Sequence, residues 1–438
     1  MDGPEPNRLK RELGIGGATM MGLGSMVGTG VFVSIGIAAG VAGPAVILAI
    51  ILAAGVATCN ALSSAQLAAS HAVSGGTYEY GYRYLNPALG FTAGWVFLYA
   101  KSASAVTAAI GFAGYFLRLV GGSLDNIAWV AVTATALLTL LVLTGMRRSS
   151  WANIAIVSVT LLALGSFVAF GIPTAVAGGD DSSTPFFTNS DGSLPEAFLY
   201  VTALMFVAFT GYGRIATLGE EVMEPRRTIP KAIIVTLIIT ALLYVAVAAV
   251  AISSIGANNF ANAPGAQATP LEHAARAMEA PLLTRLIAVG AISAMLGVLL
   301  NLVLGLSRVL LAMGRQGDMP PAFGRLTAAG VAPAATIIAT GVLIALLASF
   351  GDLESVWAFS AFTVLIYYAI TNLAALRLPE KRRLYPWWIA ITGLGACLFL
   401  AFWVPVPIWA AGSGIIALGL LWKRIVCSLW SMDQTFRG

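Results

Sequence analysis

The chain has 438 residues and a net charge of +5; 58% of its residues are hydrophobic and only 10% are charged. A soluble domain carries about 25% charged residues. This composition and the mean hydropathy of +0.87 exclude a water-soluble enzyme, a disordered chain and a secreted disulfide scaffold. The cysteines Cys59, Cys397 and Cys427 lie in or beside apolar runs without CxxC spacing, so we expect free thiols.

Long apolar runs dominate the sequence. A bilayer core of about 30 Å is crossed by about 20 apolar residues in a helix. We therefore expect an all-α membrane protein that forms one domain over residues 1–438. The predicted spans are residues 14–40, 43–69, 91–120, 126–146, 151–174, 196–219, 230–255, 281–312, 333–350, 355–376, 386–404 and 405–425.

Basic residues are distributed unevenly around these twelve spans. Of the 24 lysines and arginines, two (Lys101 and Arg214) fall inside spans, three (Arg118, Arg276 and Arg285) fall opposite the termini, and 19 fall on the side of the termini. Because cytoplasmic loops accumulate basic residues, we expect both termini in the cytoplasm and the protein in the cytoplasmic (inner or plasma) membrane. This topology accounts for the positive charge, and we expect no binding of nucleic acid.

Two longer connections are expected on the outer side. Residues 178–195 are polar, with Asp180, Asp181 and Asp191 and no basic residue. In residues 256–280, Pro270 begins an amphipathic pattern that predicts a short helix. This second loop is either a cap over a pathway or a plain connector.

The first span contains four glycines between residues 22 and 30. Close helix packing is one use of glycine in membranes. A cluster at mid-depth instead favours an interruption of the helix, because glycine tolerates irregular backbone conformations. Irregular backbone at membrane depth occurs where it lines a cavity or is buried in protein, so this segment predicts a site.

The sixth span has a similar feature, with Gly211 and Gly213 at mid-span. Two interrupted helices at matching positions of two five-helix halves are typical of inverted-repeat transporters. The N-terminal ends of half-helices favour a carboxylate, and free carbonyls favour an ammonium group. We therefore expect an amino acid as the ligand, bound near the middle of the membrane.

Four sequence stretches resemble the amino acid–polyamine–organocation (APC) permeases, in family order over roughly residues 10–325. The resemblance implies a LeuT-type fold of twelve helices that works by alternating access. Residues 14–174 and 196–376 would be inverted repeats of five helices, and residues 386–425 would be helices 11 and 12. The matching stretches are residues 24–32, residues 74–78 with Gly94 and Trp95, residues 206–211 with 220–230, and residues 307–308 with 315–320.

The same resemblance implies a binding site at the interruptions. The substrate carboxylate would meet backbone N–H groups near Thr29 and Gly30, with the Thr29 hydroxyl nearby, and the ammonium would meet carbonyls of Met26, Val207 and Thr210. The family often has a large aromatic gate where Val207 stands here. The residues implied for substrate binding and its gate are Met26, Gly28, Thr29, Gly30, Phe206, Val207, Phe209 and Thr210.

The coupling of transport to an ion is expected to differ from that in many members of the family, which carry a lysine on the fifth helix facing the first interruption. Counting from Asn153, this position is Ser158 here. Lys101 in the third span is the candidate replacement, since a lysine removed from water loses its proton more readily. The alternative for Lys101 is a lysine that snorkels to the interface or pairs with a carbonyl.

Arg214 directly follows the sixth interruption. A guanidinium keeps its charge, so Arg214 either binds an anionic substrate group, locks a gate or caps carbonyls. Glu220, Glu221 and Glu224 at the inner end of this span are interpreted as an ion-pair network rather than a proton relay. Ser293 and Asn301 in the eighth span could face a cation site or serve helix packing. The isolated histidines predict no metal, and we expect no cofactor.

The sequence therefore predicts a secondary active transporter of amino acids, by proton symport or exchange, and not an enzyme. One alternative is the same fold carrying a polyamine, another organocation or an inorganic ion. The other is an integral-membrane transferase, which would use acidic or histidine clusters near the interface. The near absence of carboxylates at mid-depth counts against it.

Overall fold

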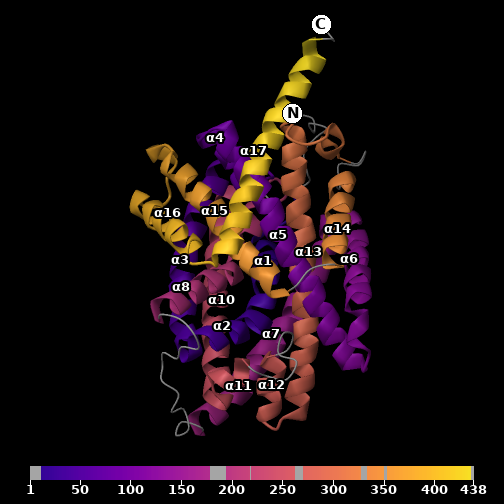
Figure 1. Ribbon diagram of the computed structural model, residues 1–438, viewed down its shortest axis with the longest axis vertical. Coiled ribbons are helices and arrows are strands. Elements are labelled where there is room, and N and C mark those ends of the chain that lie inside the picture. Colours follow the sequence, from indigo (N-terminus) through magenta and orange to yellow (C-terminus); the bar gives the residue numbers. More distant parts are fainter. Residues whose placement is uncertain are drawn as a thin grey trace.

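The computed structural model describes residues 11–177, 194–217, 219–261, 270–326, 333–349 and 353–435. In these residues all regular structure is helical, apart from one isolated β-bridge between Leu13 and Val222. The predicted all-α class is confirmed. The helices form one elongated bundle (Figure 1).

Nine helical runs in the described residues are long and apolar enough to cross a membrane. The first is 56 residues long and covers the predicted spans 14–40 and 43–69. The twelve predicted spans require this run to cross twice and two shorter apolar helices, α14 (Ala334–Ala348) and α16 (Trp387–Ala401), also to cross. The nine runs are Ile15–Ser70, Pro87–Val120, Leu124–Leu143, Arg148–Val176, Pro195–Thr217, Pro225–Ile255, Pro281–Arg315, Trp357–Leu376 and Val406–Ile425.

The first helix is interrupted where its glycines cluster. Helix α1 (Ile15–Met26) ends at Val27, which has a non-helical ψ of 87°. A π-helical turn, η1 (Gly30–Ser34), follows and leads into α2 (Ile35–Ala42).

The sixth predicted span is interrupted in the same way. Helix α8 (Leu194–Ala208) gives way to a 3₁₀ turn, η4 (Thr210–Tyr212), and then to the short helix α9 (Gly213–Thr217). Phe209 joins α8 to η4.

The two interruptions lie against each other. A Cβ atom on Gly211 would lie 2.5 Å from the carbonyl carbon of Ser25, and one on Gly30 would lie 2.5 Å from Cβ of Ala208. Such distances leave no room for a side chain, so glycine at both positions lets the two broken segments approach closely.

The remaining long helices surround this centre. Their outward faces carry large apolar side chains, including Leu137, Leu162 and Leu242, and these are exposed. Exposed apolar surface on this scale is unusual for a soluble protein and fits contact with lipid. The surrounding helices are α3 (Val46–Ser70), α5 (Pro87–Val120), α6 (Ile127–Leu143), α7 (Met146–Ala177), α10 (Pro225–Ile255), α13 (Pro281–Arg315), α15 (Leu353–Leu376) and α17 (Val406–Thr435).

Short helices mark the two ends of the bundle in Figure 1. Helix α4 (Thr77–Tyr84) lies at the end from which α17 projects, and α11 (Ala257–Ala261) and α12 (Pro270–Ala277) lie at the other. Helix α12 confirms the amphipathic helix predicted to begin at Pro270. Residues 178–193 of the first predicted outer loop, with Asp180, Asp181 and Asp191, lie outside the described residues.

Polar contacts tie helix α4 to its neighbours. The hydroxyls of Tyr78 and Tyr82 both donate to Oδ2 of Asp318, at 2.7 and 2.6 Å. Nζ of Lys423 on α17 donates to the Tyr82 hydroxyl at 2.6 Å. Helices α4 and α17 and the turn after α13 therefore share one polar cluster at this end of the molecule.

Candidate functional site

A small cavity of about 40 Å³ lies between the two helix interruptions, and we call it the central cavity. Met26, Thr29 and Gly30 line it from the first interruption, and Val207 and Thr210 from the second. Of the predicted substrate-binding residues, these five are brought together at one point. Gly28 packs on Val298 of α13, which also lines the cavity.

Two tyrosines satisfy backbone carbonyls exposed by the interruptions. The Tyr244 hydroxyl of α10 donates to the Met26 carbonyl oxygen at 2.6 Å and to that of Ala208 at 3.3 Å. The Tyr368 hydroxyl of α15 donates to the Thr210 carbonyl oxygen at 3.0 Å. Interrupted helices leave carbonyls without helical partners, so these hydroxyls stabilise the broken geometry.

Neither tyrosine was among the residues that we predicted from sequence. The available signal was a polar hydroxyl in the middle of an apolar span, since a buried tyrosine hydroxyl usually finds a partner. Sequence alone does not show that the partner is the backbone of a helix more than a hundred residues away.

The predicted aromatic gate differs in the structure. Phe206 packs edge-on against Tyr368, with ring centroids 5.8 Å apart, and Phe209 packs against Tyr244 at 5.1 Å. Both phenylalanines are buried but neither lines the central cavity. Among the described residues, the aromatic side chains that line it are Phe97 and Trp357, so the structure does not place Phe206 and Phe209 at the cavity as expected of a gate.

Lys101 reaches the second interruption from α5. Its side chain is 6% exposed, and Nζ donates to the Thr210 hydroxyl at 2.7 Å. That hydroxyl in turn donates to the Val207 carbonyl oxygen at 2.7 Å. Lys101 therefore neither snorkels to an interface nor binds a carbonyl directly, and a change in its charge would be felt at the interruption.

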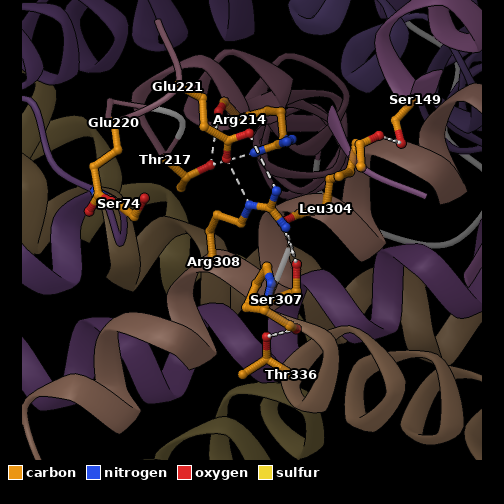
Figure 2. A network of polar contacts seen from close by, with 12 residues as sticks. Ser74, Ser149, Arg214, Thr217, Glu220, Glu221, Leu304, Ser307, Arg308 and Thr336 are labelled. Atoms are coloured by element: carbon orange, nitrogen blue, oxygen red, sulfur yellow. Dashed lines mark hydrogen bonds and ion pairs between the residues drawn. The ribbon is translucent and has the colours of Figure 1, made fainter. Parts of the chain in front are cut away.

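Arg214 lines the same cavity from α9 and is 5% exposed. Its Nη1 donates to the Thr217 hydroxyl at 3.1 Å, while Nε and Nη2 are buried without a hydrogen-bond partner in the described part of the chain. Figure 2 shows Arg214 beside the pair formed by Arg308 and Glu221.

Further unpartnered polar atoms lie on the central cavity. Three other lining residues have a buried polar atom without a partner among the described residues: Oγ of Ser25, Oδ1 of Asn301 and Nε1 of Trp357. Buried polar groups nearly always have partners. Their concentration here is what a binding pocket with convergent polar groups requires.

Ser158 does not face the first interruption, contrary to our prediction. Its side chain is exposed on the outer face of α7, and its hydroxyl donates to the Ile154 carbonyl oxygen at 2.8 Å. The α7 residues that face α1 are Asn153, whose Nδ2 donates to the Met20 carbonyl oxygen at 2.8 Å, and Val157, beside Gly24. A helix turns about 100° per residue, so a difference of one position separates the interior from the outer face.

Two of the three glutamates predicted to form an ion-pair network after α9, Glu220 and Glu221, form ion pairs in the structure. Glu221 accepts from Nε and Nη2 of Arg308 at 2.8 and 3.3 Å, with both side chains 1% exposed (Figure 2). Glu220 pairs with Arg315 at 2.9 Å. Both arginines belong to α13, which is distant from these glutamates in sequence.

The structure separates the two residues considered for a cation site. The Ser293 hydroxyl is 2.9 Å from that of Thr160, while Asn301 lies two turns further along α13 and contacts Asn153. Among the described residues no group of three or more histidine, cysteine, aspartate or glutamate side chains is placed to hold a metal ion.

Comparison with known proteins agrees with this architecture. Residues 17–432 match the family described as "Amino acid permease". An uncharacterized transporter of Mycobacterium tuberculosis is 38% identical over 95% of this chain and 91% of its own length. The branched-chain amino acid permease BcaP of Bacillus subtilis is 29% identical, over 85% of this chain and 82% of its own. Human cationic amino acid transporter 4 is 29% identical, over 85% of this chain and 61% of its own.

The chain belongs to the amino acid permease family, within the APC group that its motifs resemble. It is an integral membrane protein, and family and relatives indicate a transporter rather than an enzyme. Amino acid transport is the activity that this membership supports.

Proposed function

We propose that this protein is a secondary active transporter that moves amino acids across the cytoplasmic membrane by alternating access. The observation that carries the proposal is the meeting of two interrupted helices at one small cavity, which polar and apolar side chains line together. Interrupted helices at a site near the middle of the membrane are typical of inverted-repeat transporters. The proposal includes twelve spans, with residues 14–174 and 196–376 as the two repeats and residues 386–425 as helices 11 and 12.

The substrate backbone would bind at the two interruptions. The carboxylate would accept from N–H groups near Thr29 and Gly30, because the first N–H groups of a helical segment have no partner within it. The ammonium would donate to the carbonyls of Met26, Val207 and Thr210. The carbonyl oxygens of Met26 and Val207 each accept one hydroxyl, and a carbonyl oxygen has a second lone pair to offer. The Thr210 carbonyl oxygen accepts from the Gly213 N–H and the Tyr368 hydroxyl, so the ammonium would take the place of one of these donors.

The mode of transport is either proton symport or exchange of substrates. In symport, Lys101 would be the residue that couples substrate movement to the proton. The charged group that shares the cavity with Lys101 is Arg214, and Tyr244 and Tyr368 are the titratable groups at the interruptions. Arginine does not give up its proton in this range, which leaves Lys101 as the group that can gain or lose charge. A change of charge here would act on Thr210 and so on the second interruption.

The proposed orientation places both termini in the cytoplasm. The three basic residues that we predicted on the outer side, Arg118, Arg276 and Arg285, all line one pocket of about 580 Å³ beside α12. Their gathering at one end of the bundle supports this topology, because the basic residues of inner loops would then lie at the end with α4.

The names of the relatives favour amino acids over the other cargoes that the sequence left open. Two carry names that specify amino acids, one branched-chain and one cationic. A polyamine lacks the carboxylate that the N–H groups at Thr29 and Gly30 would bind, so we expect putrescine to be a poor substrate.

Transport by purified protein in liposomes tests the proposal. Vesicles loaded with single amino acids would be offered a labelled panel of amino acids, putrescine and an inorganic cation, with and without an imposed pH gradient. We expect uptake of at least one amino acid, driven by the gradient or by exchange with internal substrate. Uptake of putrescine or the cation alone, or of nothing, would overturn the proposal.

A further inference from the structure

The charge of the central cavity is unbalanced. Its lining includes two basic side chains, Lys101 and Arg214, and none of its described lining residues is an aspartate or glutamate. Both basic side chains are at least nine-tenths buried. A buried charge without a counter-charge is costly, so this arrangement calls for an anion that the chain itself does not provide.

Glu221, the carboxylate that lies beside Arg214 in Figure 2, cannot supply that anion alone. Glu221 already accepts two hydrogen bonds from Arg308, in the side-by-side geometry that an arginine and a carboxylate favour. Arg214 therefore lies beside a neutral pair, and one positive charge is left in excess (Figure 2).

The guanidinium of Arg214 also has unused donors. Its one side-chain hydrogen bond runs from Nη1 to Thr217, and Nε and Nη2 are buried and unpartnered within the described residues. Nε and Nη2 form an edge of the guanidinium that can bind a carboxylate with two parallel bonds. A Cβ atom added to Gly305 of α13 would lie 3.4 Å from Cδ of Arg214, so the glycine places no side chain against the arginine at this point.

We propose that the transported amino acid has an acidic side chain, aspartate or glutamate, and that Nε and Nη2 of Arg214 bind its side-chain carboxylate. This inference rests on the proposed function. The substrate backbone would lie at the two interruptions, and its side chain would extend past Thr210 toward α9. Lys101, bound to the Thr210 hydroxyl, adds a second positive charge beside the same path.

Other side chains fit the cavity less well. A cationic substrate would bring a third positive charge to Lys101 and Arg214. A neutral substrate would leave both donors of Arg214 buried without partners, which costs binding free energy. The substrate class would thus differ from that of the relatives named for branched-chain and cationic amino acids.

The test uses the full-length protein in liposomes and begins with wild type. Uptake of labelled glutamate, glutamine, aspartate, leucine and lysine would be compared at equal concentration. Glutamate and glutamine have nearly the same shape, so their comparison isolates the charge of the side chain. We expect uptake of glutamate or aspartate at least tenfold above that of glutamine, leucine and lysine.

Variants at Arg214 then test whether this residue causes the preference for a charged substrate side chain. Arg214→Met keeps much of the side-chain volume and removes the charge, and we expect it to reduce the preference for glutamate over glutamine by at least tenfold. Arg214→Lys should retain part of that preference. Arg377→Met, at an exposed arginine at the end of α15, is the control and should behave as wild type. Gel filtration and thermal unfolding would establish that each variant is folded.

The outcomes separate this inference from the proposed function. Wild-type uptake of neutral or cationic amino acids without glutamate or aspartate would overturn the acidic substrate and leave amino acid transport intact. A folded Arg214→Met protein with the wild-type preference would overturn the role of Arg214. No uptake of any amino acid would overturn both proposals. The wild-type comparison requires no variant, so a failure of Arg214→Met to fold still leaves the substrate class decided.

Discussion

The Lys101 ammonium group is buried inside the helix bundle, where it donates a hydrogen bond to a hydroxyl instead of to water. Its contact with the Thr210 hydroxyl is one link in a chain that continues to the Val207 carbonyl. Removing water disfavours the charged form of a lysine, and the contact ties that charge to the second interruption. At the scale of one residue, Lys101 thus places a titratable group in direct contact with the second interruption.

Replacement of Lys101 tests its role in proton coupling. Lys101→Ala removes the titratable group, and Lys101→Arg fixes the positive charge. We expect both variants to lose the ability to concentrate substrate against an imposed pH gradient, while Lys101→Ala keeps some binding or exchange. The measurement is uptake into liposomes with and without the gradient. Accumulation by Lys101→Ala with the pH dependence of wild type would make Lys101 a structural residue.

Side-chain direction was the least predictable property at this scale. Lys101 and Arg214 were identified from sequence because a charge inside a membrane span stands out against apolar neighbours. Ser158 was placed by counting along a helix from Asn153, and Phe206 and Phe209 were chosen because they flank Val207. A shift of one residue changes which face of a helix a side chain occupies. The tyrosines at positions 244 and 368 act through contacts with distant segments, which no local pattern reveals.

Helix interruptions are the feature that the sequence predicted best at the scale of elements. Glycine clusters mark both, because a closely packed irregular backbone leaves no room for a side chain at several nearby positions. The ion-pair partners of Glu220 and Glu221 were not predictable in this way. They come from α13, and only the folded bundle brings that helix to the end of α9.

The substitution Gly30→Ala, which adds one methyl group, tests whether function requires the close approach of the two interruptions. In Gly30→Ala the added Cβ would lie 2.5 Å from Cβ and 3.2 Å from Cα of Ala208, so the backbone of α8 must move. We expect loss of substrate uptake, because the shift displaces the groups that would bind the substrate. Gly55→Ala is the matched control, since nothing lies within 4 Å of a Cβ there. Wild-type uptake by Gly30→Ala would place the site elsewhere.

The buried pair of Glu221 and Arg308 should dominate the stability of the contact between the α9 end and α13. Removing one partner of a buried ion pair leaves an uncompensated charge and costs about 3–5 kcal/mol. We therefore expect Glu221→Gln to lower the thermal unfolding temperature strongly.

The exposed neighbour Glu224 supplies the control for this measurement. Glu224→Gln should leave the unfolding temperature nearly unchanged, because exposed charges contribute little. Equal effects of the two substitutions, measured on purified protein in detergent, would show that the buried pair has no special role.

At the scale of the whole molecule, charge is concentrated at the two ends and in the central cavity. The end with α4 has a polar cluster that links α4 to α17 and to the end of α13 through Tyr82, Asp318 and Lys423. A transporter that opens alternately to each side must break and remake contacts at its ends. Titratable groups in such a cluster therefore connect the stability of one conformation to pH.

Glu79 of α4 is the group for which this dependence has a definite sign. Burial, assisted by the nearby Glu220 and Asp318, raises the pKa of Glu79 from 4.5 to about 7, against the opposing effects of Gln316 and Arg315. Because the folded state then holds the proton more tightly than the unfolded state, the stabilisation is fully present below the unfolded pKa and is lost as pH rises through about 7. The free energy of unfolding should fall over this interval because an ionised carboxylate remains partly buried.

The comparison of wild type with Glu79→Gln isolates this effect. Glutamine keeps the shape of the side chain and carries no titratable group. The unfolding temperature of the variant, relative to that of wild type, should therefore increase as pH rises from about 5 to about 8. Glu380→Gln, at an exposed glutamate, is the control and should follow wild type at every pH. Thermal unfolding of the purified proteins in detergent provides the measurement. Parallel curves for wild type and Glu79→Gln would show that Glu79 is already ionised in the folded protein and does not link its stability to pH.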